Sequence, residues 1–391
     1  MVKIEKIKYE DIIKEIGNIE CCDEIKQHTV DKISYVKKYV ENWLYVMTRI
    51  TNEVYFIDCM SNAGIYKNGY FCSCIEVLEI FYSFAINHPD VNFHLLCNDY
   101  NKKRIDILNS VIKYSKKAHS NILNVSICTS NEDATTFINK LTKSLNTSVK
   151  KSVLIYVDPY NFVTNDLLDS LFNFTSVIYS ELILNFFSSD VTRNIGNLSA
   201  YKKKEAFNKV VSNYVPNEAD GNVTSNQLMY AVIDKFTNAT NLKYKYVFQI
   251  KNSKNVEQYY LLYFTPNLKG LSKLKNTVWQ LFGASKNNKK IDIDTNTYDL
   301  FGNTPFDYIK NDNLNTVKNK LNEFIGKSVS YKDIEKIVLE STIFTESYII
   351  KYIIKPLINE RVLIKQNLIS TRNYIDDKYK VSTISVLKEI F

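Results

Sequence analysis

The chain has 391 residues and a net charge of +8, and 45% of its residues are hydrophobic and 24% are charged. These values are typical of a soluble globular protein with two or three domains, and the modest positive charge favours a polyanionic partner only weakly. No apolar run approaches the ~20 residues that cross a bilayer, so we expect no membrane span. Residues 1–13 carry charges throughout, unlike a signal peptide.

The seven cysteines and four histidines are scattered along the chain. No CxxC pair occurs, and Cys72-Ser73-Cys74 has the wrong spacing for a zinc knuckle. The histidines form no HExxH or HxxxH motif. We therefore expect no metal site, and reduced thiols fit a cytoplasmic protein best.

Residues 1–50 are predicted to form a helical segment ahead of the first domain. Within it, the stretch 26–47 places Ile33, Val36 and Trp43 at helical spacing. A helix that packs on a sheet is the simplest interpretation. His28 and Lys32 lie one turn apart on one face of this helix and could also point at a site.

Five short strands alternate with helices in the next part of the chain. The strands are predicted at 54–57, 92–97, 125–128, 152–157 and 180–186. The helices between them are predicted at 73–86, 101–117, 134–145 and 165–172. This alternation is the signature of an α/β fold with a doubly wound, mostly parallel sheet. The unbroken apolar run 152–157 is typical of a central strand that is buried on both faces.

Four of the predicted strands run into an acidic residue, namely Asp58, Asp99, Asp133 and Asp158. The carboxyl ends of parallel strands meet at one edge of a sheet, where ligands bind. Asp58 is followed by a loop of small and polar residues that ends in Gly64. This stretch suggests a nucleotide-like cofactor, and an ordinary turn after a strand is the alternative.

Asp99 and Asp133 each have two interpretations. Asp99 follows the second strand, where acids bind ribose hydroxyls in nucleotide-binding sheets. Asp133 could meet the adenine amine of a cofactor. Both could instead cap the helices that follow them, a role for which Asp is strongly preferred.

Asp158-Pro159-Tyr160 is the sharpest local signal for a substrate site. Asp158 can accept a hydrogen bond from an exocyclic amine, and Pro159 can turn its carbonyl toward the same group. Tyr160 could stack on a base, an interaction worth ~1–3 kcal/mol. The motif would then seat the amino group of an adenine or a cytosine. A strand-end turn is the alternative, because Asp-Pro is common in turns.

Two polar residues accompany the fifth strand. Asn185 lies in an apolar run and needs a hydrogen-bond partner when it is buried. It is therefore a member of either a structural network or the site. Arg193, a little further on, could pair with an acid or hold a phosphate.

The predicted sheet domain covers residues 51–290. It contains an insertion at 196–245 that would cap the sheet edge, with helices at 201–214 and 225–237. Two strands, at 245–251 and 258–265, and a helix at 271–282 follow. Residues 291–313 are predicted to be a linker.

Residues 314–391 are predicted to form a separate winged-helix-like domain. Three helices, at 315–325, 331–339 and 345–359, precede two strands at 362–369 and 379–382. Pro356 must kink or shorten the third helix. Residues 303–391 carry 14 Lys and Arg against 11 Asp and Glu, a net of +3. A winged helix that grips DNA is usually more basic, so a packing or protein-contact role is equally favoured.

Several short motifs, taken in order, resemble the three-Cys-motif partner (TcmP) family. They are HTVDKISYVKKYVENWL, YFIDCMSNAGIYKNGYFCSCIEVL, the Asp133-Ala134 pair, LIYVDPYNF, ELILNFFSSDVTRN and YYLLYFTPNLKG. The resemblance covers nearly the whole chain by the order of these motifs. It implies a fold similar to that of class I S-adenosylmethionine-dependent methyltransferases, with a C-terminal winged-helix-like region.

The resemblance also implies roles for individual residues. It places Asp58, Asn62 and Gly64 in the cofactor loop (DLFAGPG), Ser73 at GSP, Asp133 at DAN, Asp158-Pro159 at DPFG, and Asn185 and Arg193 in the INF…R segment. The chain departs from the family where Asn62 replaces a glycine and Ala63 a proline, and where the glycine after DPF is lost.

The leading hypothesis is a protein that binds S-adenosylmethionine and methylates an exocyclic amine of a DNA or RNA base, without a metal. Asp58, Asn62, Gly64, Asp99 and Asp133 would hold the cofactor. Asp158, Pro159 and Tyr160 would orient the target amine, mainly by positioning it, with Asn185 and Arg193 near the substrate. One alternative is a catalytically weakened methyltransferase-fold scaffold that works with a protein partner, as in a defence complex. Another is a nucleic-acid-binding module that acts through residues 314–391.

Overall fold

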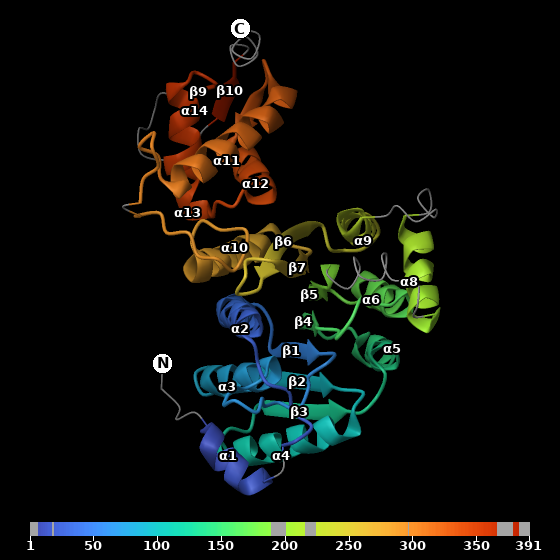
Figure 1. Ribbon diagram of the computed structural model, residues 1–391. Helices are drawn as coiled ribbons and strands as arrows, with labels where there is room; N and C mark the ends of the chain where they lie inside the picture. Colours follow the sequence, from blue (N-terminus) through green and yellow to red (C-terminus); the bar gives the residue numbers. More distant parts are fainter. Residues whose placement is uncertain are drawn as a thin grey trace. The chain divides into compact units, whose positions relative to one another are not determined.

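The computed structural model describes residues 7–17, 19–188, 201–215, 224–295, 297–365 and 378–382. The chain forms two compact units, Met1–Asn267 and Leu268–Phe391 (Figure 1). The division precedes helix α10 (Leu268–Phe282), so this helix groups with the second unit rather than with the sheet domain. In the described residues, no helix combines the length and the apolar character needed to cross a membrane.

The first unit is built on a seven-stranded sheet with the order β3-β2-β1-β4-β5-β7-β6. Its strands are β1 (Glu53–Asp58), β2 (Asn92–Asn98), β3 (Val125–Ser130), β4 (Ser152–Val157), β5 (Ser180–Phe186), β6 (Tyr244–Lys251) and β7 (Glu257–Thr265). The first five strands pair in parallel, while β7 runs antiparallel between β5 and β6. This is the strand order of the class I methyltransferase fold, so the predicted doubly wound, mostly parallel sheet is confirmed.

Helices cover both faces of this sheet. They are α1 (Tyr9–Ile16), α2 (Gln27–Met47), α3 (Ser73–Ala85), α4 (Lys102–Ala118), α5 (Ala134–Leu145), α6 (Asn165–Val177), α8 (Tyr201–Tyr214) and α9 (Ser225–Ala239). On one face, α5, α6, α8 and α9 share a hydrophobic core with Leu262 and Phe264 of β7. Tyr263, which lies between Leu262 and Phe264 in β7, contacts Tyr39 of α2 instead. Successive side chains of a strand point to opposite faces, so α2 lies on the other side.

The central strands show why the sequence pattern predicted them well. Every residue of β4 and of β5 is buried. Helices on both faces leave such strands no polar side, which makes their sequence continuously apolar.

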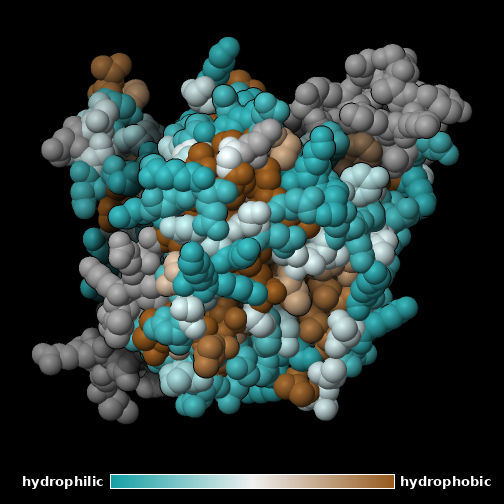
Figure 2. All heavy atoms as spheres, turned by 90° about the horizontal axis from the view of Figure 1, so that it is seen from below, coloured by the Kyte–Doolittle hydropathy of each residue, from teal (hydrophilic) through white to brown (hydrophobic). Residues whose placement is uncertain are grey.

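The solvent-facing side of α4 has a different pattern, because Lys102, Lys103 and Lys113 are exposed there. The face of the molecule in Figure 2 is accordingly mostly hydrophilic, with hydrophobic side chains visible between polar ones.

The second unit contains helices and a small antiparallel sheet with the order β8-β10-β9. After α10 its elements are α11 (Pro305–Leu321), a 3₁₀ turn (Asn322–Phe324), β8 (Ser328–Ser330), α12 (Tyr331–Ser341), α13 (Glu346–Ile349), a π-helical turn (Ile350–Ile354), α14 (Lys355–Asn359), β9 (Leu363–Lys365) and β10 (Lys378–Val381). Its core holds Val317, Ile334, Phe344, Ile353 and Tyr379.

Two local features of the second unit have clear causes. Helix α11 begins inside the predicted linker, because the Thr304 hydroxyl accepts from Asp307 N while the Asp307 carboxylate accepts from Thr304 N. This reciprocal capping, with Pro305 in the first turn, starts a helix. Pro356 was expected to kink or shorten its helix. The helix continues through it, and a π-helical turn precedes it.

Candidate functional site

A pocket of about 280 Å³ opens where β1 and β4 end. It is lined by the segment before α2, by α2 itself, by the β1–α3 loop and by the residues after β4 and β5. The residues are Asp23, Glu24, Lys26, Thr29, Lys32, Asp58, Met60, Ser61, Asn62, Tyr66, Cys72, Ser73, Tyr156, Asp158, Pro159, Tyr160 and Phe187. The predicted ligand edge of the sheet therefore carries a pocket.

The β1–α3 loop keeps a tight turn despite its departures from the family pattern. Asn62 has a φ of 56°, in the left-handed region that Asn tolerates better than most residues. Its Oδ1 accepts from Ala63 N at 2.7 Å. Gly64 has a φ of +78°, and a Cβ there would lie 2.8 Å from Cδ1 of Leu108. The conformation at position 62 is thus one that asparagine adopts, whereas a side chain at Gly64 would be strained by its positive φ and would press on Leu108.

Asp58 is the buried acid at the floor of the pocket. Its exposed fraction is 1%, and its Oδ1 accepts from Met60 N at 3.2 Å. The pKa of Asp58 is raised to about 8, mainly by burial and also by the charges of Asp158 and Asp99, whereas the Met60 N–H and Lys32 act in the opposite direction. Asp58 is therefore mostly protonated at neutral pH and can donate a hydrogen bond.

Asp99 joins the two loops that follow β1 and β2. Its Oδ2 accepts from Asn62 N at 3.0 Å and its Oδ1 from Asn101 N at 2.8 Å. Burial raises the pKa of Asp99, while the two N–H groups and Arg104 oppose that rise. Asp99 is not a lining residue of the pocket, but it fixes the backbone of Asn62, which is.

Asp158 lies in the pocket with both carboxylate oxygens engaged. Oδ2 forms an ion pair with the Lys32 ammonium of α2, and Oδ1 accepts from Asn185 Nδ2 at 2.6 Å. Lys32 is only 5% exposed, and its Nζ lies 5.3 Å from the centroid of the Tyr259 ring. The Nδ2 of the buried Asn185 thus has a partner, whereas its Oδ1 finds none within the described residues. Lys32 reaches the site from the face on which the sequence placed it.

Asp23 connects the N-terminal segment to the rim of the pocket. Its Oδ2 accepts from Arg104 Nη2 at 2.9 Å and from the Tyr160 hydroxyl at 3.2 Å. Arg104 also donates to the Tyr160 hydroxyl, and its guanidinium lies 4.7 Å from the centre of that ring. Two further hydrogen bonds tie the same segment to the β1–α3 loop. The side-chain amide of Asn68 donates to Ile25 O and accepts from Ile25 N. No motif in the sequence indicated Asp23 or Arg104.

The pocket brings together some of the predicted site residues but not all of them. Those in its lining are Asp58, Asn62, Asp158, Pro159 and Tyr160, while Gly64, Asp99 and Asn185 support them from behind.

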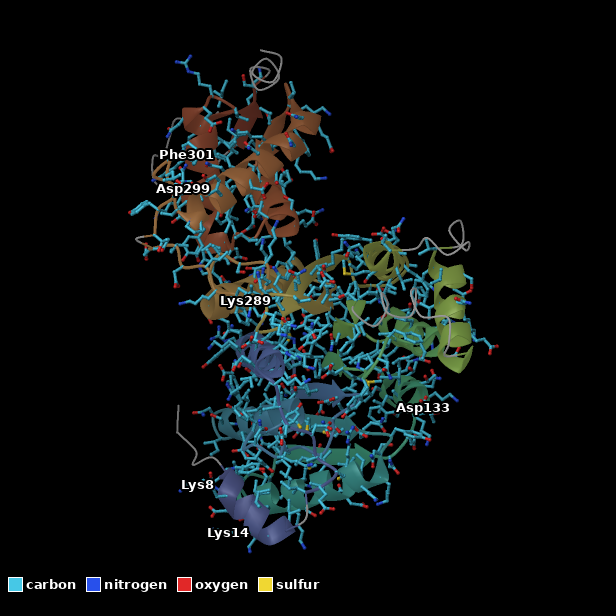
Figure 3. All side chains as sticks on the ribbon, viewed as in Figure 1. Lys8, Lys14, Asp133, Lys289, Asp299 and Phe301 are labelled. Atoms are coloured by element: carbon cyan, nitrogen blue, oxygen red, sulfur yellow. The ribbon has the colours of Figure 1, made fainter. Side chains whose placement is uncertain are left out.

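Asp133 and Arg193 stand apart from this group. Asp133 is exposed next to α5 (Figure 3), and its Oδ1 accepts from Thr135 N at 2.9 Å, so it acts as the N-cap. Arg193 lies outside the described residues. In the described ranges, no group of three or more His, Cys, Asp or Glu could hold a metal ion.

Comparisons with known proteins add distant structural likenesses. No family model matches the chain, and no curated protein does. Protein LPL1258 from Legionella pneumophila is 13% identical, with a TM-score of 0.36 over 64% of this chain and 92% of its own. Magnesium protoporphyrin IX methyltransferase from Synechocystis PCC 6803, solved with bound SAH, is 10% identical, with a TM-score of 0.32 over 66% of this chain and 94% of its own. The methyltransferase domain of bacterial CtHen1 is 10% identical, with a TM-score of 0.29 over 59% of this chain and 99% of its own.

Proposed function

We propose that the chain binds S-adenosylmethionine and transfers its methyl group to an exocyclic amine of a nucleic-acid base. The observation that carries this proposal is the pocket that Asp58, at the end of β1, and Asn62 line together with the Asp158-Pro159-Tyr160 turn after β4. In a doubly wound sheet, a nucleotide-like cofactor binds at the first of these turns. A target group at the second would then lie beside it.

The chemistry of the lining fits this cofactor. Asp23, Glu24 and Asp158 are acidic, which suits a ligand with a sulfonium cation. The buried hydroxyl of Tyr156 finds no hydrogen-bond partner within the described residues, and a bound ligand would supply one. Asn62 and Gly64 shape the loop that approaches the cofactor, and Asp99 follows β2, where ribose hydroxyls are bound. Asp133 is left out of this set because it caps α5 at the surface.

The target amine would hydrogen-bond to the Pro159 carbonyl and share the Asp158 carboxylate with Lys32. When bound, the cofactor supplies an electrophilic methyl group. The residues of this chain align the amine with it, keep water out and hold the acceptor oxygens in place. Asn185 fixes the direction of the Asp158 carboxylate through its 2.6 Å hydrogen bond.

A scaffold with weakened catalysis is the second candidate, and one observation favours it. Lys32 and Asn185 already occupy both oxygens of Asp158, so a target amine must compete with an internal cation. In this version the chain binds the cofactor and contacts a protein partner but turns over slowly. A cytoplasmic protein of the three-Cys-motif partner type fits both candidates.

The second unit contributes a contact surface in either case. Its element order, helix-strand-helix-helix-strand-strand from α11 to β10, is that of a winged helix. We infer a winged-helix-like domain that contacts nucleic acid or a protein partner. The near-neutral charge of residues 303–391 does not decide between these two partners.

Calorimetry with the full chain tests the cofactor. Titration with S-adenosylmethionine and with S-adenosylhomocysteine should give binding, and Asp99→Asn should weaken it about 10-fold or more, in line with the loss of one charge-assisted hydrogen bond. Asp133→Asn is the matched control and should bind like the wild type, because Asn caps helices as well as Asp does. Absence of binding at millimolar cofactor would refute the proposal.

Radiolabelled methyl transfer separates the two candidates. DNA and RNA are incubated with the chain and methyl-labelled cofactor, and the bases are identified after nuclease digestion. Label on the amino group of adenine or cytosine, lost in Asp158→Ala, supports the enzyme. Cofactor binding without any transfer supports the scaffold.

A further inference from the structure

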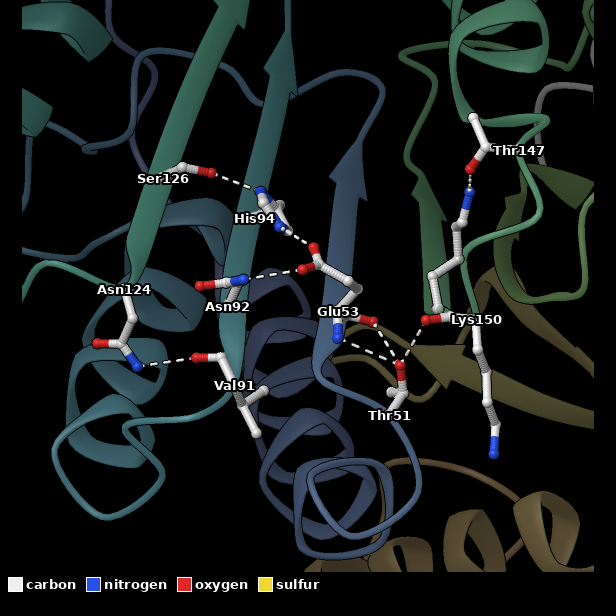
Figure 4. Close-up of polar contacts among 10 residues, drawn as sticks. Thr51, Glu53, Val91, Asn92, His94, Asn124, Ser126, Thr147 and Lys150 are labelled. Atoms are coloured by element: carbon white, nitrogen blue, oxygen red, sulfur yellow. Dashed lines mark hydrogen bonds and ion pairs between the residues drawn. The ribbon is translucent and has the colours of Figure 1, made fainter.

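A second constellation of chemically active side chains lies at the other end of the sheet. Glu53 of β1, His94 of β2 and Ser126 of β3 follow one another across three adjacent parallel strands (Figure 4). His94 Nε2 lies 2.7 Å from Glu53 Oε2, and His94 Nδ1 lies 2.6 Å from Ser126 Oγ. An acid, an imidazole and a hydroxyl are therefore connected in that order.

His94 and Glu53 are each held from a second side. The His94 ring stacks on Tyr55, with 4.2 Å between centroids and 14° between planes. The Glu53 carboxylate also accepts from Asn92 Nδ2 at 2.8 Å. Partial burial alone would raise the pKa of Glu53, but the hydrogen bonds from Asn92 and His94 outweigh it, and the pKa is lowered. Glu53 is thus an anion with a fixed direction.

The anion decides which nitrogen of His94 carries the proton. Because Glu53 can only accept, Nε2 donates to it, and Nδ1 is left with its lone pair directed at Ser126. A hydroxyl beside a base that a third group orients is the signature of an activated nucleophile. Ser126 is exposed, and the His94 and Glu53 side chains are 22% and 23% exposed, so small molecules can reach the row.

Another cluster of the same residue types shows what an inert arrangement looks like. Glu79 lies between Ser115 and His119, accepting from Ser115 Oγ at 3.1 Å and lying 3.4 Å from His119 Nε2. Ser115 is fully buried. Its hydroxyl donates to the acid rather than to the imidazole, so the imidazole is not positioned to remove its proton. Of these two clusters, the Glu53 row is the one with the acid–imidazole–hydroxyl order that activates a serine.

We propose that Ser126 is an activated nucleophile, with His94 as its general base and Glu53 orienting the imidazole, and that it reacts with small acyl or phosphonyl electrophiles. With a fluorophosphonate, Ser126 Oγ forms a bond to phosphorus as fluoride leaves. The hydroxyl proton moves to His94 Nδ1 and is then lost to water, so the net reaction releases HF.

This reactivity does not depend on the proposed methyl transfer. Glu53 and Asp58 are the first and last residues of β1. Five residue steps at ~3.3 Å each separate the two sites by roughly 17 Å. Labelling at Ser126 should therefore leave cofactor binding in the pocket unchanged, and a failure of either proposal can be recognised without the other.

The test is labelling of the full chain with a fluorophosphonate, followed by peptide mapping. Ser126 should be the labelled residue, and Ser126→Ala should abolish the label. His94→Phe keeps a ring on Tyr55 but removes the base, and should lower the rate by ~10²- to 10⁴-fold. Glu53→Gln should also lower the rate. Ser110→Ala is the control, since this exposed serine donates to Asp106 O and should not affect labelling.

Two further measurements distinguish activation from a structural role. The labelling rate should fall at acidic pH, because a protonated Nδ1 cannot accept the serine proton. In His94→Ala, added free imidazole should restore part of the rate, and circular dichroism should show an unchanged fold. Label spread over other serines, or equal rates in the wild type and His94→Phe, would overturn the proposal.

Discussion

Two buried carboxyl groups in the same sheet differ in the hydrogen-bond donors that surround them. Glu181, near the start of β5, accepts from Thr265 Oγ1 at 3.0 Å, from the Tyr263 hydroxyl at 3.1 Å and from the Tyr39 hydroxyl. Asp58, at the end of β1, accepts from Met60 N at 3.2 Å. Burial raises the pKa of both acids.

The difference separates a structural acid from a site acid. The three hydroxyls around Glu181 come from a helix and a strand that pack together only in the folded chain, so the network holds α2 against β7. Asp58 has less support from the protein and lies in a pocket with Asp158 and Lys32. A buried carboxyl with few fixed partners is where a ligand gains most from binding.

Changing the pH should have the largest effect, and it acts on Asp58. Its pKa is about 8 in the folded chain, against ~3.9 in the unfolded chain. The folded state then holds the extra proton, so the free energy of unfolding falls as pH rises from about 4 to 8, by on the order of 1 kcal/mol per pH unit, and levels off above 8. Thermal unfolding of the wild type and of Asp58→Asn at pH 5 to 9 measures this. Glu181 is common to both chains and cancels, so parallel curves would contradict a buried, protonated Asp58.

Removing the structural acid should have the next largest effect. Glu181→Leu removes the carboxylate that accepts from the Tyr39, Tyr263 and Thr265 hydroxyls, and we expect a loss of about 3 kcal/mol in the free energy of unfolding. Asp58→Asn keeps the Met60 hydrogen bond and should change the free energy of unfolding by less than about 1 kcal/mol near pH 4, where the ionisation of Asp58 in the unfolded chain contributes little. Urea denaturation followed by circular dichroism compares the two. Equal losses of stability in the two variants would show that both acids have a structural role.

The loop after Asp58 should give the smallest effect. Asn62→Gly should be close to neutral, because glycine also adopts the φ of 56° found there. Asn62→Val should cost about 1–2 kcal/mol, because a β-branched residue is strained in the left-handed region. The same urea experiment measures both variants. If both were neutral, the loop would not hold the conformation on which its approach to a ligand depends.

The strands could be predicted from the sequence because their environment is simple. The run 152–157 is apolar throughout since β4 is buried on both faces, and its bounds match the structure. The place of β7 between β5 and β6 left no local signal, because strand pairing depends on contacts between distant segments. The start of α11 did leave one, the Thr304-Pro305 cap with Asp307, which the predicted linker overlooked.

The site was predictable only as far as strand ends determine it. Asp58 and Asp158 lie in the pocket because β1 and β4 are neighbours in the sheet. Asp133 follows the edge strand β3 and caps a helix, a role that the same residue type performs equally well. Asp23 and Arg104, 81 residues apart, meet through a loop and a helix end. Neither position has a pattern that a sequence could reveal.

The reversed strand β7 also affects how the chain is made. It fills the gap between β5 and β6, so the edge of β5 stays unpaired until β7 has been synthesised. The stretch from Phe186 to Glu257 takes roughly 4–14 s to translate at ~5–20 residues per second. An apolar strand with an open edge is a template for pairing with another chain. The nascent protein therefore passes through an interval in which a strand that is fully buried in the folded chain has an open edge.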